Sequence, residues 1–207
     1  MFTTINQMMT TNRAAQQIMI ILLKDFNSHT ATSLSEELKM SRQGTWKILK
    51  KLEKDEFIIL EQIGKGKTST QRIKLNWSSE VLEKTLALFL AQEALKHKRW
   101  KFDFSDLKPD VDFLILYGSI LHSPKEAQDI DIMGVVSQEK KLAHLGDIVL
   151  KIQETQAKKI HSINLTQKEF KQEIKRPNKT YLGVVKKGII LFGQESFIKF
   201  IRGLQKW

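Results

Sequence analysis

The chain contains no cysteine, and only three prolines and ten glycines occur among its 207 residues. The absence of cysteine excludes a disulfide framework, thiolate zinc sites and cysteine nucleophiles. Any bound metal must therefore be held by oxygen or histidine, which favours hard cations such as Mg²⁺. With 41% hydrophobic residues and so few helix breakers, the composition indicates a globular protein.

Long apolar runs are also missing. The longest, at residues 18–23 and 86–91, span six residues each, whereas a membrane helix needs about 20. No basic n-region precedes the apolar stretch near the N-terminus, so a signal peptide is not expected. These absences predict a cytoplasmic protein.

Positive charge is what the chain has in excess. Its 34 Lys and Arg against 23 Asp and Glu give a formal net charge of +11. Such a surplus favours a polyanionic partner: nucleic acid, nucleotide phosphates or an acidic membrane face. Residues 1–77 and 78–207 carry 12 and 22 basic residues against 7 and 16 acidic ones. The excess is therefore shared by both parts of the chain.

Three helices are predicted between residues 13 and 57. The first has an apolar stripe at helical spacing, formed by Ile18, Ile21, Leu22 and Phe26. A polar stretch, NSHTAT, separates it from a short second helix that we expect to start after an N-cap at Ser33 and to run through Leu38.

A third helix and a hairpin complete this segment. Ser41 is the expected N-cap of the third helix, on which Thr45, Leu49 and Leu52 share one face. The stretches FIILEQI and QRIKLNW then predict two strands around the turn GKGKTST.

The exposed face of the third helix has the chemistry of a DNA-binding surface. Arg and Gln near a helix N-terminus can reach base edges, whereas lysines further along meet phosphates. Residues 39–54 include six basic residues and one acidic residue. The predicted contacts are Arg42, Gln43, Trp46, Lys47 and Lys50 on the helix, with Lys65 and Lys67 at the hairpin tip. The alternative is a solvated basic face with Trp46 packed against a neighbour.

This order of elements over residues 13–76 resembles the winged helix-turn-helix domains of the MarR-like family. The stretch TATSLSEELKMSRQGTWKILKKLEKDEFII carries the resemblance as a pattern of residues. One departure is Glu56, where such domains often place glycine before the first wing strand. The resemblance implies binding to nucleic acid, with duplex DNA as the expected partner.

The rest of the chain predicts a connecting helix and an α/β segment. Helical spacing covers residues 79–97, and apolar strands are expected at 112–118, 129–136 and 159–165, with helices at 139–157 and 167–176. GIILFG precedes a last helix. We expect an α+β protein with a winged helix at 1–77, a connecting helix at 78–100 and an α/β domain with a small mixed sheet at 101–207.

The most informative motif lies between two of these strands. Gly118 and Ser119 follow the first strand, and Asp129 and Asp131 open the next after nine residues. Alternation along a strand places the two aspartates on one face. Paired carboxylates repel one another unless a cation lies between them, and Mg²⁺ carried by a nucleoside triphosphate supplies that cation. Gly118 leaves room for a phosphate, and Ser119 offers a hydroxyl at an expected helix N-terminus.

This motif of Gly-Ser, a spacer and Asp-hydrophobic-Asp resembles that of the minimal nucleotidyltransferases of the DNA polymerase β superfamily. The resemblance covers residues 100–193. The resemblance implies ATP or another NTP as donor, Mg²⁺ or Mn²⁺ held by two catalytic aspartates, and transfer of a nucleoside monophosphate to a hydroxyl.

The chain departs from this family at three places. His122-Ser123 stand where relatives carry Arg-Gly, and Gln128 replaces a serine. A third carboxylate normally lies on the following strand, but no Asp or Glu occurs between Glu154 and Glu169. That strand offers His161, Ser162 and Asn164. Two of them are candidates for the missing group: His161 is a possible base near neutral pH, and Asn164 is a weaker metal ligand.

Three functions stay open. The first is a nucleotidyltransferase brought to its target by the winged helix. The second is a transcriptional regulator whose C-terminal domain only binds nucleotide. The third is an antitoxin-like partner of a toxin. Winged-helix relatives also make a homodimer an expectation. Residues 140–187, with twelve basic and four acidic residues, form either an acceptor-binding surface or solvated helix faces.

Overall fold

The computed structural model describes residues 12–64, 70–176 and 178–205. The chain divides into two compact units, Met1–Leu86 and Ala87–Trp207. Among the helices of the described residues, none has the length and hydropathy required to cross a membrane.

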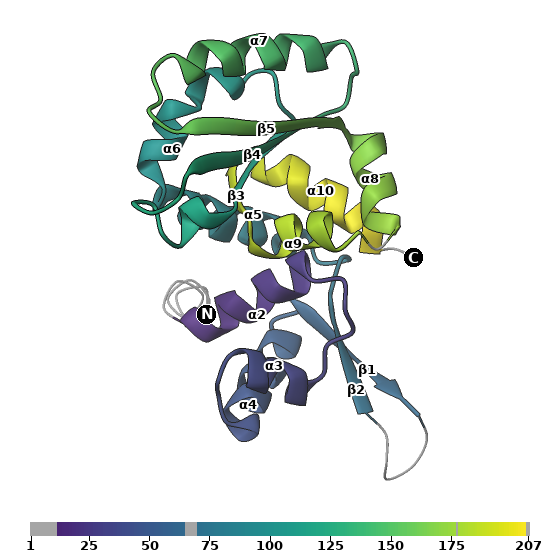
Figure 1. Ribbon diagram of the computed structural model, residues 1–207. Coiled ribbons are helices and arrows are strands. Elements are labelled where there is room, and N and C mark those ends of the chain that lie inside the picture. The colour runs from purple at the N-terminus through teal and green to yellow at the C-terminus, as the bar shows by residue number, and fades with distance from the viewer. Residues whose placement is uncertain (1–11, 65–69, 177, 206–207) are drawn as a thin grey trace. The chain divides into compact units, whose positions relative to one another are not determined.

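Before the connecting helix, the described residues of the N-terminal unit form three helices and then a two-stranded wing (Figure 1). The strands are antiparallel, with Ile58 opposite Leu75 and Ile63 opposite Thr70. This is the winged helix-turn-helix order expected from the sequence. Its elements are α2 (Arg13–Lys24), α3 (Ala31–Glu37), α4 (Arg42–Lys54), β1 (Ile58–Ile63) and β2 (Thr70–Leu75).

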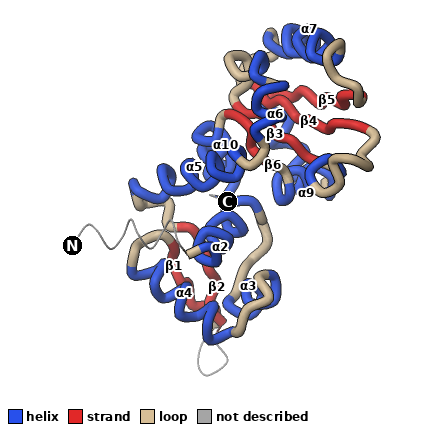
Figure 2. Tube along the Cα trace, turned by 90° about the vertical axis from the view of Figure 1, so that its left-hand side faces the viewer, coloured by secondary structure: helices blue, strands red, loops and turns tan. Residues whose placement is uncertain are grey.

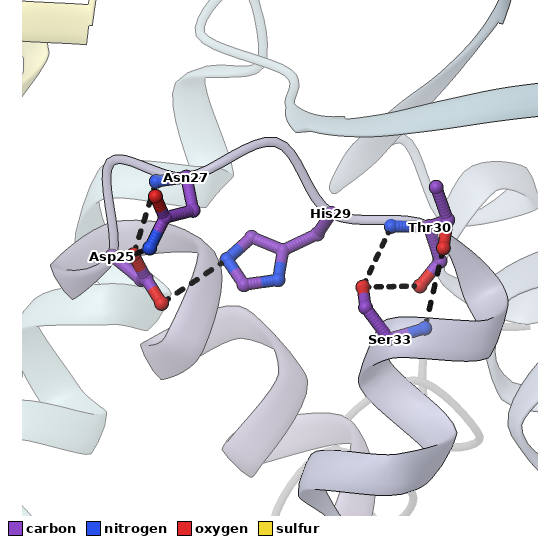
Figure 3. Close-up of polar contacts among 5 residues, drawn as sticks. All are labelled: Asp25, Asn27, His29, Thr30 and Ser33. Atoms are coloured by element: carbon purple, nitrogen blue, oxygen red, sulfur yellow. Dashed lines mark hydrogen bonds and ion pairs between the residues drawn. The ribbon is translucent and has the colours of Figure 1, made fainter.

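The start of α3 differs from the sequence prediction. Thr30, and not Ser33, is the N-cap: its hydroxyl accepts a hydrogen bond from the Ser33 backbone N–H at 3.2 Å. The Ser33 hydroxyl accepts in return from the Thr30 N–H at 2.9 Å (Figure 3). Both hydroxyls suit an N-cap, and the extended backbone of Thr30 decides between them because Ser33 is already helical.

A buried polar cluster closes the loop between α2 and α3 (Figure 3). The Asp25 carboxylate accepts hydrogen bonds from the Asn27 backbone N–H at 3.0 Å and from its side-chain amide at 2.8 Å. Its other oxygen lies 3.6 Å from His29 Nε2, and both side chains are only 6% exposed. The His29 carbonyl accepts from the Ile73 N–H at 2.9 Å. The cluster therefore ties the loop to the wing.

Glu56, where the resemblance to winged-helix domains predicts glycine, occupies the turn between α4 and β1. Its φ of 60° lies in the left-handed region, which costs roughly 1–2 kcal/mol for a residue with a Cβ. The Phe57 N–H bonds to the Leu52 carbonyl at 2.9 Å, and the Asn76 side-chain amide donates to the Glu56 carbonyl at 3.0 Å. These bonds hold the turn between α4 and β1 in spite of the substitution.

The C-terminal unit is built on a four-stranded mixed sheet in the order β5-β4-β3-β6. Strand β3 is antiparallel to β4 and β6, whereas β4 and β5 are parallel. The elements from the connecting helix onward are α5 (Glu80–Leu95), α6 (Lys98–Asp103), β3 (Phe113–Tyr117), β4 (Asp129–Val136), α7 (Lys141–Gln153), β5 (Lys159–Thr166), α8 (Gln167–Lys175), α9 (Lys179–Lys187), β6 (Ile189–Phe192) and α10 (Gln194–Gln205).

The sequence pattern missed two of these helices and overextended another. The short helices α6 and α9 were not predicted, and α7 ends at Gln153 instead of residue 157. Asn178 begins α9: its side chain accepts a hydrogen bond from the Thr180 N–H at 3.1 Å. The α9 sequence, KTYLGVVKK, spans only nine positions and is too short to indicate a helix by period alone.

Helices cover both faces of the sheet (Figure 2). On one face Ile130 and Ile132 share a core cluster with Leu145 and Val149 of α7. On the other face Phe113 packs against rings from α8 and α10, namely Phe170, Phe197 and Phe200, at centroid distances of 6.3, 5.5 and 5.5 Å. Asp129 and Asp131 alternate with Ile130 and Ile132, so they belong to the second face.

Candidate functional site

The third helix of the N-terminal unit presents the predicted DNA-contacting side chains outward. Ser41 caps α4 as expected, accepting from the Gly44 N–H at 3.1 Å. Thr45, Leu49 and Leu52 are buried. On the remainder of the helix surface Trp46 is partly exposed, and the exposed polar residues are Arg42, Gln43, Lys47, Lys50 and Lys54.

The charged side chains on this surface are only weakly paired. Lys50 Nζ lies 5.1 Å from the centre of the Trp46 ring and 2.9 Å from Glu53 Oε2. The Lys50 and Glu53 side chains are 50% and 36% exposed. An exposed pair of this kind contributes roughly 0–1 kcal/mol, so a DNA phosphate can replace the carboxylate.

The wing carries paired charges that the sequence pattern did not reveal. Glu61 on β1 lies 2.8 Å from Lys74 Nζ and 3.8 Å from Arg72 on β2. The hydrogen bond and the charge of Lys74 lower the pKa of Glu61. Arg72 also donates to the Ser28 hydroxyl at 3.0 Å. The predicted contacts Lys65 and Lys67 lie outside the described residues.

The C-terminal unit brings three chemically active side chains together at one edge of the sheet. The His161 Nδ1 atom lies 3.2 Å from Asp129 Oδ2 and 3.7 Å from Asp131 Oδ1. Register explains this convergence: His161 on β5 pairs with Asp131 on the parallel strand β4. One ligand atom from each of the three lies within 4.8 Å of the others.

Gly118 lies against this cluster with no room for a side chain. Its φ is +82°, and an added Cβ would lie 2.1 Å from Asp131 Oδ2. A conformation and a contact of this kind require glycine. The strand pairing of Tyr117 with Asp131 places the two segments together.

Ser119 does not begin a regular helix. It starts a 3₁₀ turn of three residues, Ser119–Leu121, which corrects the predicted helix N-terminus. Pro124 supplies the physical reason, because it lacks an N–H and disfavours a helical conformation in Ser123. Ser119 and Gly118 nevertheless line the same pocket.

Electrostatics at this edge reflect partly buried, repelling acids. Burial, and then the charge of Asp129, raises the pKa of the Asp131 carboxyl, while His161 acts in the opposite direction. Burial also raises the pKa of Tyr117 to about 12, helped by Asp131, Tyr181 and Asp129. A bound cation would relieve the repulsion between the two carboxylates.

Asn164 lies apart from the cluster. It lies on the opposite face of β5 from His161, and its Oδ1 accepts a hydrogen bond from the Ser162 hydroxyl at 3.1 Å. The same oxygen would be 2.6 Å from a Cβ added to Gly134, whose other neighbours include Leu145 of α7. Of the two residues predicted on this strand, the structure brings only His161 to the aspartates.

A pocket of about 310 Å³ opens beside Gly118. Strand β3 and its following turn supply Tyr117, Gly118, Ser119, Leu121 and His122, and α9 supplies Thr180, Gly183, Val184 and Lys187. No sequence pattern indicated Tyr117, Thr180 or Lys187 as site residues. The basic stretch 140–187 was the available signal for Lys187, but α9 had not been recognised.

Comparison with known proteins identifies the class of the N-terminal unit. Residues 12–59 match the family described as winged helix-turn-helix DNA-binding. The matched range runs from the N-cap of α2 into the first wing strand. The chain thus contains a winged helix-turn-helix DNA-binding domain. No curated protein and no solved structure matches the chain.

Charge reversal on α4 tests the DNA surface. We expect Lys47→Glu/Lys50→Glu to weaken duplex binding at least tenfold at low salt, because two phosphate contacts are lost. The slope of log affinity against log salt should become shallower by about two. Fluorescence anisotropy across a salt series measures both quantities.

The control is Lys98→Glu/Lys199→Glu, which makes the same charge change at exposed positions of the C-terminal unit. Equal losses in the two double variants would contradict contacts through α4, since they would reflect net charge alone.

Titration tests the electrostatics around Tyr117. In protein carrying ring-labelled tyrosine, NMR should give a Tyr117 pKa near 12, with Tyr117→Phe assigning the signal. Because the folded state retains the phenol proton while an unfolded tyrosine loses it near pH 10, this residue's contribution to stability declines as the pH rises from about 10 to 12.

Asp131→Asn should lower the Tyr117 pKa by removing a repelling charge, whereas Asp110→Asn, elsewhere in the unit, should leave it unchanged. An unchanged pKa in Asp131→Asn would show that the carboxylate does not act on Tyr117.

Proposed function

We propose that this chain is a DNA-binding nucleotidyltransferase whose C-terminal unit binds a nucleoside triphosphate with a divalent cation. The observation that carries the proposal is the contact of the Asp131 carboxylate with the bare backbone of Gly118, beside Asp129. It combines a position for a cation with a position for a phosphate on one edge of a sheet.

The donor atoms fit a hard divalent cation. Two carboxylates on one strand face are the ligands that Mg²⁺ and Mn²⁺ commonly take in phosphate-binding sites. Asp129 and Asp131, 31% and 23% exposed, are open enough for entry of the ion. When bound, the cation would neutralise phosphate charge and stabilise charge that develops on the leaving group.

The pocket beside Gly118 suits the triphosphate. Gly118 lines this pocket, and Ser119 and Thr180 bring hydroxyls to the lining. Lys187, at the end of α9, adds a positive charge to the lining. Charged hydrogen bonds of this type are the stronger ones in anion recognition.

In the proposed reaction a hydroxyl oxygen of the acceptor forms a bond to the α-phosphorus. The bond between that phosphorus and the oxygen of pyrophosphate breaks, pyrophosphate leaves, and the hydroxyl proton passes to a base. The chain's own residues hold the triphosphate and orient the α-phosphorus for this displacement. The winged helix keeps the unit near DNA.

A second function is favoured by one specific observation. Within the described residues, the group that joins Asp129 and Asp131 is an imidazole and not a third carboxylate. A site without that carboxylate can bind nucleotide and lack an efficient base for transfer. The chain would then be a DNA-binding regulator that senses a nucleoside triphosphate.

Labelled ATP separates the two functions. We expect the full chain, with Mg²⁺ or Mn²⁺, to transfer label from α-³²P-ATP and none from γ-³²P-ATP to a hydroxyl acceptor, with DNA, RNA and the chain itself offered. Asp129→Ala/Asp131→Ala should abolish transfer, while Asp106→Ala/Asp147→Ala removes two exposed carboxylates elsewhere and should retain it.

Cation-dependent binding of a fluorescent ATP analogue without transfer of label would support the regulator. Failure of the wild-type chain to bind nucleotide would contradict both functions.

Lys187→Ala tests the phosphate end of the pocket. We expect nucleotide affinity to fall about tenfold, since a charged hydrogen bond contributes roughly 1.5–3 kcal/mol. Isothermal titration calorimetry with ATP measures the change. Lys179→Ala, which removes an exposed lysine from the same helix outside the pocket lining, is the matched control. Equal affinities for the two variants would exclude a contact between Lys187 and the nucleotide.

A further inference from the structure

We propose that His161 is the third protein ligand of the cation site and makes it prefer a first-row transition metal, such as Mn²⁺, over Mg²⁺. This inference rests on the proposed function, which assigns Asp129 and Asp131 to the cation. It adds the identity of the third ligand and the chemical class of the ion.

The spacing of the donor atoms fits a shared ion. Ligands at about 2.1 Å from an octahedral cation are about 3.0 Å apart when adjacent and about 4.2 Å apart when opposite. The His161 Nδ1 lies 3.2 and 3.7 Å from one oxygen of each aspartate. These distances place the imidazole and both carboxylates around one centre with only small adjustments of side chains.

The strand register makes this arrangement a property of the fold. His161 is opposite Asp131 across a parallel pair that runs without interruption from Asp129 with Lys159 to Val136 with Thr166. A side chain so placed needs no backbone movement to reach the ion. Among residues 12–64, 70–176 and 178–205, this is the one place where at least three such side chains converge within ligand range.

Exposure leaves the outer side of the site open. The His161 side chain is 46% exposed, compared with 31% for Asp129 and 23% for Asp131. The protein therefore supplies ligands from the sheet, and the remaining positions face solvent and can take phosphate oxygens or water. A site with three protein ligands and open positions is typical of a metal that meets its substrate.

The imidazole determines the preference. Mg²⁺ selects oxygen ligands and sheds its water reluctantly, so a nitrogen donor adds little to its affinity. First-row transition metals accept imidazole together with carboxylates, and Mn²⁺ also resembles Mg²⁺ in its use of oxygen ligands. Replacing a carboxylate by histidine therefore shifts the site towards the transition metals without removing its ability to bind phosphate.

The experiment measures metal binding to the full chain without nucleotide. We expect Mn²⁺, followed by electron paramagnetic resonance and calorimetry, to bind at least tenfold more tightly than Mg²⁺. Pulsed resonance should detect a ¹⁴N coupling from the imidazole. His161→Ala should weaken Mn²⁺ at least tenfold, affect Mg²⁺ less and abolish the coupling. His161→Asp should retain binding but narrow the preference for Mn²⁺, again without the coupling.

His144→Ala is the matched control. His144 lies 3.6 Å from the Asp110 carboxylate, so this substitution removes a similar histidine–aspartate pair elsewhere in the unit. It should change neither affinity nor coupling. Wild-type protein with bound Mn²⁺ but no ¹⁴N coupling, or His161→Ala with an unchanged Mn²⁺ to Mg²⁺ ratio, would overturn the role of His161.

If the role of His161 is overturned but Asp129→Ala/Asp131→Ala still loses Mn²⁺ binding, the two-carboxylate cation site of the proposed function remains supported. A wild-type chain that binds neither cation would overturn the inference and the cation site of the proposed function together. Circular dichroism verifies that each variant folds. Because the His161 side chain is partly exposed, its replacement is expected to leave the fold intact.

Discussion

The C-terminal unit depends on the contact between the Asp131 carboxylate and the backbone of Gly118. An added Cβ at Gly118 would lie 2.1 Å from Asp131 Oδ2, and the φ of +82° independently requires glycine. The contact joins the end of β3 to the start of β4. Gly118 also lines the adjoining pocket, so this contact places the acidic cluster next to the phosphate-binding side of the proposed site.

Repulsion and burial give this edge its chemical character. Burial and the charge of Asp129 raise the pKa of Asp131, and the same groups raise that of Tyr117. His161 partly offsets the repulsion from the neighbouring strand. In a chain with a net charge of +11, Asp129 and Asp131 thus place two negative charges side by side, where a divalent cation would stabilise them. The exposed cations of α4 serve the opposite purpose, because their weak pairing leaves them available to DNA.

Local signals in the sequence were sufficient where a single residue type suits a position. Ser41 was predicted as the cap of α4, and the period of Thr45, Leu49 and Leu52 identified its buried face. Signals failed where two residues could serve equally, as at Thr30 and Ser33. They also failed for the buried pair of Asp25 and His29. That pair lies in a loop held by the wing strand, which is hydrogen-bonded to the His29 carbonyl, so no local pattern indicates it.

The sequence by itself determined the helix-turn-helix, its wing, the strands of the mixed sheet and the shared face of Asp129 and Asp131, since each follows from periodicity within one segment. Only the tertiary structure decided that His161, and not Asn164, joins those aspartates. Alternation shows that the two residues lie on opposite faces of β5, but a shift of one residue against β4 would exchange them. That register is set by packing between strands and helices far apart in the chain, and no local pattern contains it.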